Sequence, residues 1–171
     1  MPSIMGHLSS ITNVDGKELH LRGTVRAPSG KPKANVIVYI YHTDAQGNYL
    51  GASATQPHGQ LRAWFRIDAQ GRYGFDTIRP AAYPAQDGST REPARIHMHL
   101  LEPGRCSYYL DDLLFSDDLQ PSASRHASAL VQPRGGRGLQ RPKRNADGVW
   151  QVQRAIAVGL NIPNYSECGA R

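Results

Sequence analysis

His97 and His99 are the sharpest chemical signal in the sequence, because a single residue separates them in a run, ARIHMHLLE at 94–102, that is typical of a β-strand. Residues i and i+2 of a strand point to the same face, so both imidazoles lie opposite the apolar residues of the run. Two imidazoles placed in this way can chelate one metal ion. The pair does not choose the metal, and two ordinary histidines on a solvent-facing strand would show the same spacing.

Two tyrosines stand in segments that are typical of turns. Tyr49 ends the DAQGNY segment, and Tyr83 lies in IRPAAYP. A rigid turn can hold a phenol in a set direction, and a phenolate is a hard anionic oxygen donor that suits ferric iron. The chain has eight tyrosines, and most tyrosines pack in cores or lie at surfaces, so position alone does not single out these two.

The other five histidines show no partner spacing; they are His7, His20, His42, His58 and His126. His58 lies between Pro57 and Gly59 in the loop after Tyr49, where it could face a substrate, but we expect it to be a surface residue.

Short strands that alternate with turns dominate the first two thirds of the chain. The turns are rich in Asp, Asn, Gly and Pro, which supply the dihedral angles and local hydrogen bonds that turns need. The DAQG tetrapeptide occurs twice, each time in a turn. This spacing predicts an antiparallel β-sandwich or barrel. The strands expected here are LHLRGTV at 19–25, ANVIVYIYHTD at 34–44, AWFRID at 63–68 and RYGFDTI at 72–78.

The last third is less regular. VWQVQRAIAVGL at 149–160 alternates as a final strand, and YYLDDLLF at 108–115 favours a short turn of helix. The stretch between them is poor in large apolar residues and rich in Gly, Pro and Arg. We therefore expect one domain over 1–171, with its core at about 18–118 and 148–160 and an irregular basic loop at 122–147.

Length, charge and cysteine content indicate the class of ligand and the cellular compartment that suit this domain. The chain has 171 residues and a net charge of +6, which attracts anionic ligands without naming them. It shows no apolar run long enough to cross a bilayer and no secretion signal at its start, so we expect no membrane partner and a cytoplasmic location. Cys106 and Cys168 lie far apart in the sequence, so we expect reduced thiols and no disulfide.

Four blocks in order resemble the intradiol ring-cleavage dioxygenases, the family that contains protocatechuate 3,4-dioxygenase and catechol 1,2-dioxygenase. The chain resembles the small single-domain members, and the likeness runs over about residues 20–118. The blocks are VIVYIYHTDAQGNY, WFRIDAQGRYGFDTIRPAAYP, PARIHMHLLEPG and the F-x-x-D from Phe115 to Asp118.

The resemblance implies an antiparallel β-sandwich and a non-haem Fe(III) ion held by Tyr49, Tyr83, His97 and His99. Tyr49 matches the tyrosine that stays on the metal, and Tyr83 matches the one that leaves when substrate binds and accepts a proton. The implied reaction opens a catechol between its hydroxyl-bearing carbons, incorporates both atoms of O2 and yields a cis,cis-muconate type diacid. A small aromatic diol and O2 are therefore the expected partners.

The sequence departs from the family pattern beside the expected ligands. The family's block is R-P-A-H-x-H, and Ala94 stands where arginine precedes the first histidine by three residues. We expect Arg95, which points to the ligand face, or Arg91 to supply the missing positive charge to the ring. Asp111 and Asp112 replace a family glutamine. A carboxylate bordering the pocket would repel acidic substituents, which predicts that neutral or alkyl catechols are preferred over protocatechuate.

Two other functions fit parts of the sequence. The skeleton from Gly23 to Phe75 also occurs in non-catalytic prealbumin-like sandwiches that bind carbohydrate or protein, and iron content separates that alternative from an enzyme. The basic loop could track phosphates, but it has no aromatic residue to stack on bases, so we expect no nucleic-acid partner. Its cations are Arg134, Arg137, Arg141, Lys143 and Arg144. A homo-oligomer that covers edge strands is also possible.

Overall fold

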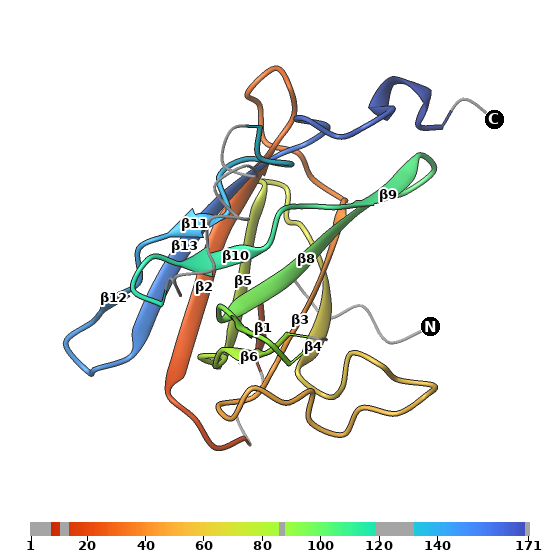
Figure 1. The fold of residues 1–171 in the computed structure, drawn as a ribbon. Coiled ribbons are helices and arrows are strands. Elements are labelled where there is room, and N and C mark those ends of the chain that lie inside the picture. The colour runs from red at the N-terminus through yellow and green to blue at the C-terminus, as the bar shows by residue number, and fades with distance from the viewer. Residues whose placement is uncertain (1–7, 11–13, 86–87, 119–131, 170–171) are drawn as a thin grey trace.

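Two β-sheets lie face to face in the computed structural model of the chain, which describes residues 8–10, 14–85, 88–118 and 132–169 (Figure 1). The first sheet has the order β11-β10-β8-β3-β4, with β9 also paired to β8. Its strands are β3 (Ile37–His42), β4 (Arg62–Arg66), β8 (Arg95–Glu102), β9 (Cys106–Tyr109), β10 (Leu113–Phe115) and β11 (Leu139–Gln140).

The second sheet has the order β1-β5-β2-β13-β12. Its strands are β1 (Leu8–Ser10), β2 (Glu18–Arg26), β5 (Arg72–Ile78), β12 (Lys143–Arg144) and β13 (Trp150–Ala157). A small separate ladder joins β6 (Tyr83–Pro84) to β7 (Arg91–Glu92), and a 3-10 turn, η2 (Tyr165–Glu167), lies near the C-terminus.

The expected β-sandwich is confirmed, but its strands are not all antiparallel. The long strand β13 runs parallel to β2 along eight paired positions, and β1 and β10 have parallel neighbours as well. A parallel neighbour needs a long connection instead of a hairpin. In Figure 1, β13, in blue, lies beside β2, in orange, although most of the chain separates the two strands in the sequence.

Alternating side chains divide each sheet into an inner and an outer face. On β8 the residues that alternate with the histidines, Ile96, Met98 and Leu100, have no exposed surface and pack in the core with Leu21 of β2 and Phe75 of β5. The residues that alternate with them on β8 point to the outer face of the first sheet. The core therefore fixes which face carries the candidate site.

The helical turn expected at 108–115 is wrong. Residues 106–109 and 113–115 form β9 and β10, and both pair with β8 in antiparallel register. The Asp111–Asp112 pair is the joint between the two strands. The backbone groups along the edge of β8 are paired by β9 and β10. The hydrogen bonds gained by this pairing outweigh the local preference for helix.

The basic segment is also more regular than predicted where the structure describes it. Residues 132–147 contain β11 and β12, which sit at the edges of the two sheets. The remainder of the predicted loop, including His126, lies outside the described residues. The final strand, expected to run to residue 160, ends at Ala157.

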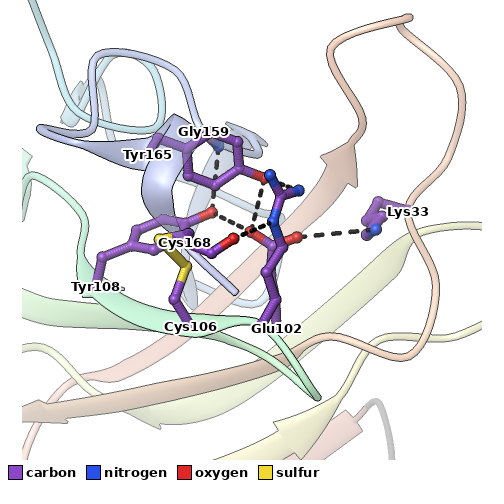
Figure 2. The surroundings of a disulfide bond; sticks show 8 residues. Lys33, Glu102, Cys106, Tyr108, Gly159, Tyr165 and Cys168 are labelled. Atoms are coloured by element: carbon purple, nitrogen blue, oxygen red, sulfur yellow. Dashed lines mark hydrogen bonds and ion pairs between the residues drawn. A yellow bond between two sulfur atoms is a disulfide. The ribbon is translucent and has the colours of Figure 1, made fainter. Parts of the chain in front are cut away.

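The expectation of reduced thiols is wrong as well, because Cys106 and Cys168 form a disulfide with a Cα–Cα distance of 5.4 Å across a sequence separation of 62. Distance along the chain did not reveal this, since the end of the chain folds back onto β9 (Figure 2). Disulfides persist in oxidising compartments, so this bond does not favour the expected cytoplasmic location.

A buried carboxylate lies next to this disulfide, because Glu102 of β8 pairs with Cys106 of β9. The side chain of Glu102 is 3% exposed, and its Oε1 accepts hydrogen bonds from the hydroxyls of Tyr108, at 3.0 Å, and Tyr165, at 2.8 Å. Arg105 donates to the hydroxyl of Tyr165 and to the carbonyl oxygen of Cys168. These contacts and the disulfide together hold the segment around η2 against the β8–β9 hairpin.

We expect Cys168→Ser to lower the free energy of unfolding by about 2–4 kcal/mol, because loss of the cross-link frees the unfolded chain. Urea unfolding of wild type and variant, each with and without a reducing agent, measures the difference. The reductant should lower wild-type stability to the variant's value and leave Cys168→Ser unchanged. Equal stability of the two proteins under oxidising conditions would show that the bond does not form in solution.

Among the described residues, no helix is long and apolar enough to cross a membrane.

Candidate metal centre

Strand β8 presents three polar side chains on the outer face of the first sheet: Arg95, His97 and His99. Each is partly buried, and they alternate with fully buried apolar residues. The register pairs His97 with Tyr41 of β3, and His99 with Tyr39 of β3 and with Tyr109 of β9. The predicted same-face placement of both histidines and of Arg95 is confirmed.

The loop that follows β3 sets the position of Tyr49. The carboxylate of Asp44 accepts hydrogen bonds from the backbone N–H groups of Gln46 and Asn48, both at 2.9 Å, and the Asp44 N–H donates to the Asn48 carbonyl oxygen. Such an Asx-type turn is rigid. It directs the phenol of Tyr49 to His97, whose Nε2 lies 2.9 Å from the Tyr49 hydroxyl oxygen.

Gly47 brings the loop that carries Tyr83 against this turn. Gly47 has a φ of 86°, and a Cβ there would lie 2.6 Å from the carbonyl oxygen of Ala82, so only glycine permits the approach. The short β6–β7 ladder pairs Tyr83 with Glu92 and holds the next phenol in place. The ring centroids of Tyr49 and Tyr83 are 6.3 Å apart.

Asp112 orients His97 by contacting the ring nitrogen that does not face Tyr49. Its Oδ1 lies 2.9 Å from Nδ1 of His97, and its Oδ2 lies 3.2 Å from Nη1 of Arg95. Since a carboxylate only accepts, Nδ1 of His97 carries the proton and Nε2 keeps its lone pair toward Tyr49. Burial alone would raise the pKa of Asp112, but the hydrogen bond from His97 and the charge of Arg95 outweigh it and hold that pKa below its usual value.

Both phenols are protonated in the metal-free protein at neutral pH. Burial raises the pKa of Tyr49, and the neighbouring Tyr83 raises it further. Burial also raises the pKa of Tyr83, against the opposing charge of Arg95, whose guanidinium carbon lies 5.7 Å from the centre of the Tyr83 ring. A cation that binds these oxygens must therefore displace their protons.

These groups surround an open cavity of about 940 Å³. Its polar and aromatic walls include Tyr41, Tyr49, His58, Tyr83, Glu92, Arg95 and His97. Three of the four predicted ligands thus line one cavity. His99 is not among the lining residues, and its ring lies 3.6 Å from that of Tyr109, centre to centre.

His58 is a cavity residue that sequence reasoning placed at the surface. Its ring stacks on Tyr41 at 3.7 Å, Tyr41 stacks in turn on His97 at 4.5 Å, and Nδ1 of His58 lies 2.7 Å from the hydroxyl oxygen of Tyr39. Tyr41 therefore separates His58 from His97. No spacing in the sequence could have signalled this contact, because it depends on how the loop folds over β3.

The other residues singled out beside the ligands do not line the cavity. Ala94 is buried, and its N–H donates to Asp118 Oδ2 at 3.0 Å. Arg91 is exposed and donates to the carbonyl oxygen of Ala82. Asp111 accepts from the backbone of Arg134 on the far side of the β9–β10 joint.

The predicted repulsion of acidic substituents depended on Asp111 or Asp112 bordering the pocket. Asp112 is occupied by His97 and Arg95, and neither it nor Asp111 lines the cavity. The predicted repulsion of acidic substituents has no source at these two residues. The carboxylate on the cavity wall belongs to Glu92, which is paired with Arg95.

The donor set suits a ferric ion only through its tyrosines. Among the described residues, no group of three or more His, Cys, Asp or Glu side chains could hold a metal. Two phenol oxygens and one imidazole nitrogen nevertheless converge at Tyr49, Tyr83 and His97. Hard anionic oxygen donors of this kind favour Fe(III).

Comparison with known proteins places the chain among dioxygenases. The family model described as dioxygenase matches residues 8–132. Catechol 1,2-dioxygenase 2 of Acinetobacter lwoffii is 36% identical over 102 residues, which are 52% of this chain and 37% of that protein. The chain spans less than half the length of the first curated relatives that it matches.

Solved structures share the fold. 3-Chlorocatechol 1,2-dioxygenase from Rhodococcus opacus 1CP superposes with a TM-score of 0.68 at 21% identity, over 92% of this chain and 68% of that one. The dioxygenase domain of a dioxygenase carbohydrate-binding protein fusion from Streptomyces sp. SirexAA-E gives 0.66 at 20% identity, over 92% of this chain and 90% of that one.

The β-sandwich fold and the family model together define the class of protein. The chain belongs to the intradiol ring-cleavage dioxygenase family. The family match includes the segment from Gly23 to Phe75, on which the non-catalytic alternative rested.

Proposed function

We propose that this chain opens a catechol-type aromatic ring between its two hydroxyl-bearing carbons, with non-haem Fe(III) as cofactor and O2 as second substrate. The observation that carries the proposal is the convergence of Tyr49, Tyr83 and His97 at the wall of one cavity. Family membership supplies the reaction class. The proposed product is a cis,cis-muconate type diacid that contains both atoms of O2.

A bound ferric ion would supply Lewis acidity, which withdraws electron density from the diol and prepares the ring to react with O2. The protein supplies the proton acceptor. A catechol loses protons when it binds as an anion, and Tyr83 is placed to take one of them. Tyr83 would hold the ion as a phenolate, and burial, which raises the pKa of its phenol, favours the protonated form that proton uptake would give.

Arg95 is proposed as the positive charge beside the reacting ring. Its guanidinium lines the cavity next to Tyr83 and is fixed by the carboxylates of Glu92 and Asp112. A fixed cation in a partly closed site stabilises negative charge without reorganising, which is worth on the order of a few kcal/mol of barrier. Arg91 is not placed for this role, since it contacts the backbone at Ala82.

The test is oxygen consumption by protein reconstituted with iron, compared with zinc-loaded and metal-free protein. With catechol or 4-methylcatechol, the iron form should consume one O2 per diol, and labelled O2 should place both oxygen atoms in the ring-opened acid. Protocatechuate belongs in the same panel. Folded, iron-loaded protein that consumes no O2 with any of these diols would contradict the proposal.

A further inference from the structure

Arg95, and not His99, is the neighbour of His97 on the side of the two tyrosines. Arg95 and His97 both line the cavity, together with Tyr49 and Tyr83. The guanidinium of Arg95 lies over the Tyr83 ring. Along β8 the order of these side chains is Arg95, His97, His99, so His99 lies on the other side of His97 from the residue that meets Tyr83.

The surroundings of His99 are aromatic and distinct from the cavity. Its strand neighbours are Tyr39 and Tyr109, whose ring centres lie 5.7 and 3.6 Å from the centre of the imidazole. Its Nε2 is buried and has no hydrogen-bond partner among the described residues. That orphan nitrogen is the one feature that suits a ligand, but no contact joins it to either candidate phenol.

Arg95 cannot replace a histidine as a donor. A guanidinium carries only N–H donors, stays charged in proteins and offers a metal no lone pair. Here it is held on two sides, by Glu92 and by Asp112. The position beside His97 that faces Tyr83 therefore holds a cation that cannot donate to a metal.

We propose that the metal centre of this chain has three protein donors, Tyr49, Tyr83 and His97. Arg95 lies beside these donors as a cation that does not bind the metal, and His99 lies outside the centre. The inference rests on the proposed iron cofactor and goes beyond it. With three protein donors in place of the four that the family resemblance implies, one more coordination position would be open to solvent or to an anionic ligand.

Two substitutions on β8 test this assignment. His99→Ala removes the nitrogen that is assigned no metal role. Arg95→His creates a histidine pair at 95 and 97 on the cavity side. Each purified variant is titrated with ferric iron, in competition with a chelator, and binding is read from phenolate-to-iron absorbance and from metal analysis. Circular dichroism confirms that each variant is folded.

His99→Ala should keep the wild-type iron affinity and absorbance band. Arg95→His should bind iron at least about tenfold more tightly and shift the band, because a new nitrogen donor enters the centre. If Arg95→His does not fold, His99→Ala decides alone. Loss of iron and colour in His99→Ala overturns the proposal.

The same titrations separate this proposal from the proposed function. Wild type that binds iron through three donors but does not cleave any diol leaves the assignment standing and removes the activity. Wild type that binds no ferric iron overturns both, because the three donors then form no centre at all.

Discussion

Substitution of His97 by alanine is expected to abolish ferric-iron binding and, with it, catechol cleavage. Among the described residues, His97 is the only imidazole with a nitrogen within hydrogen-bonding distance of a candidate phenol, 2.9 Å from the Tyr49 oxygen. Loss of an outer-sphere partner costs about 10–100-fold in metal affinity, so loss of a donor should exceed that range. Metal analysis after dialysis and phenolate-to-iron absorbance measure the effect without substrate.

His20→Ala is the matched control for this experiment. His20 lies on β2 in the opposite sheet, where it contacts Glu18 and Gln151. It should retain iron and colour at wild-type levels. Retention of iron by His97→Ala, with the variant folded, would remove His97 from the centre and with it the site proposed here.

Most strands could be predicted from the sequence, because the alternation of apolar and polar residues that produces them lies within each strand. The alternation of Ile96, Met98 and Leu100 with polar residues fixes the inner and outer faces of β8, and burial confirms it. Turn residues likewise marked the ends of β3 and β5. The strands of 106–115 were missed because their pairing depends on the free edge of β8, which no local pattern reveals.

The candidate site was only partly predictable for a similar reason. Turn chemistry around Tyr49 and the same-face rule for His97 were enough to bring these two groups together. Which of the outer-face residues of β8 reaches Tyr83 depends on where the β6–β7 ladder lies. The H-x-H spacing favoured His99 as the second nitrogen, whereas the structure turns Arg95 toward Tyr83.

The disulfide could not be predicted from local sequence patterns either. Cys106 and Cys168 have no motif between them, and only the return of the chain over Glu102 brings them together. His58 and Asp112 were likewise noticed in the sequence without their partners. Their contacts come from tertiary placement, which a single sequence does not encode in any short pattern.

Asp112→Asn should lower iron affinity by about 10–100-fold, although Asp112 is not a proposed ligand. The carboxylate accepts from Nδ1 of His97 at 2.9 Å and pairs with Arg95 at 3.2 Å, so it fixes the ring tautomer and balances the guanidinium. Asparagine can still accept one hydrogen bond, but its amide group would face another donor and its negative charge is gone. His97 should then be a weaker and less well-oriented donor.

Asp111→Asn provides the comparison, because it makes the same chemical change one residue away. Asp111 accepts from the backbone of Arg134 at 3.1 Å and does not line the cavity. We expect its iron affinity and absorbance band to match wild type, and both variants to show similar thermal stability. Equal losses of iron affinity in the two variants would mean that any loss of negative charge near β10 weakens binding. A loss confined to Asp112→Asn would tie the effect to the hydrogen bond with His97.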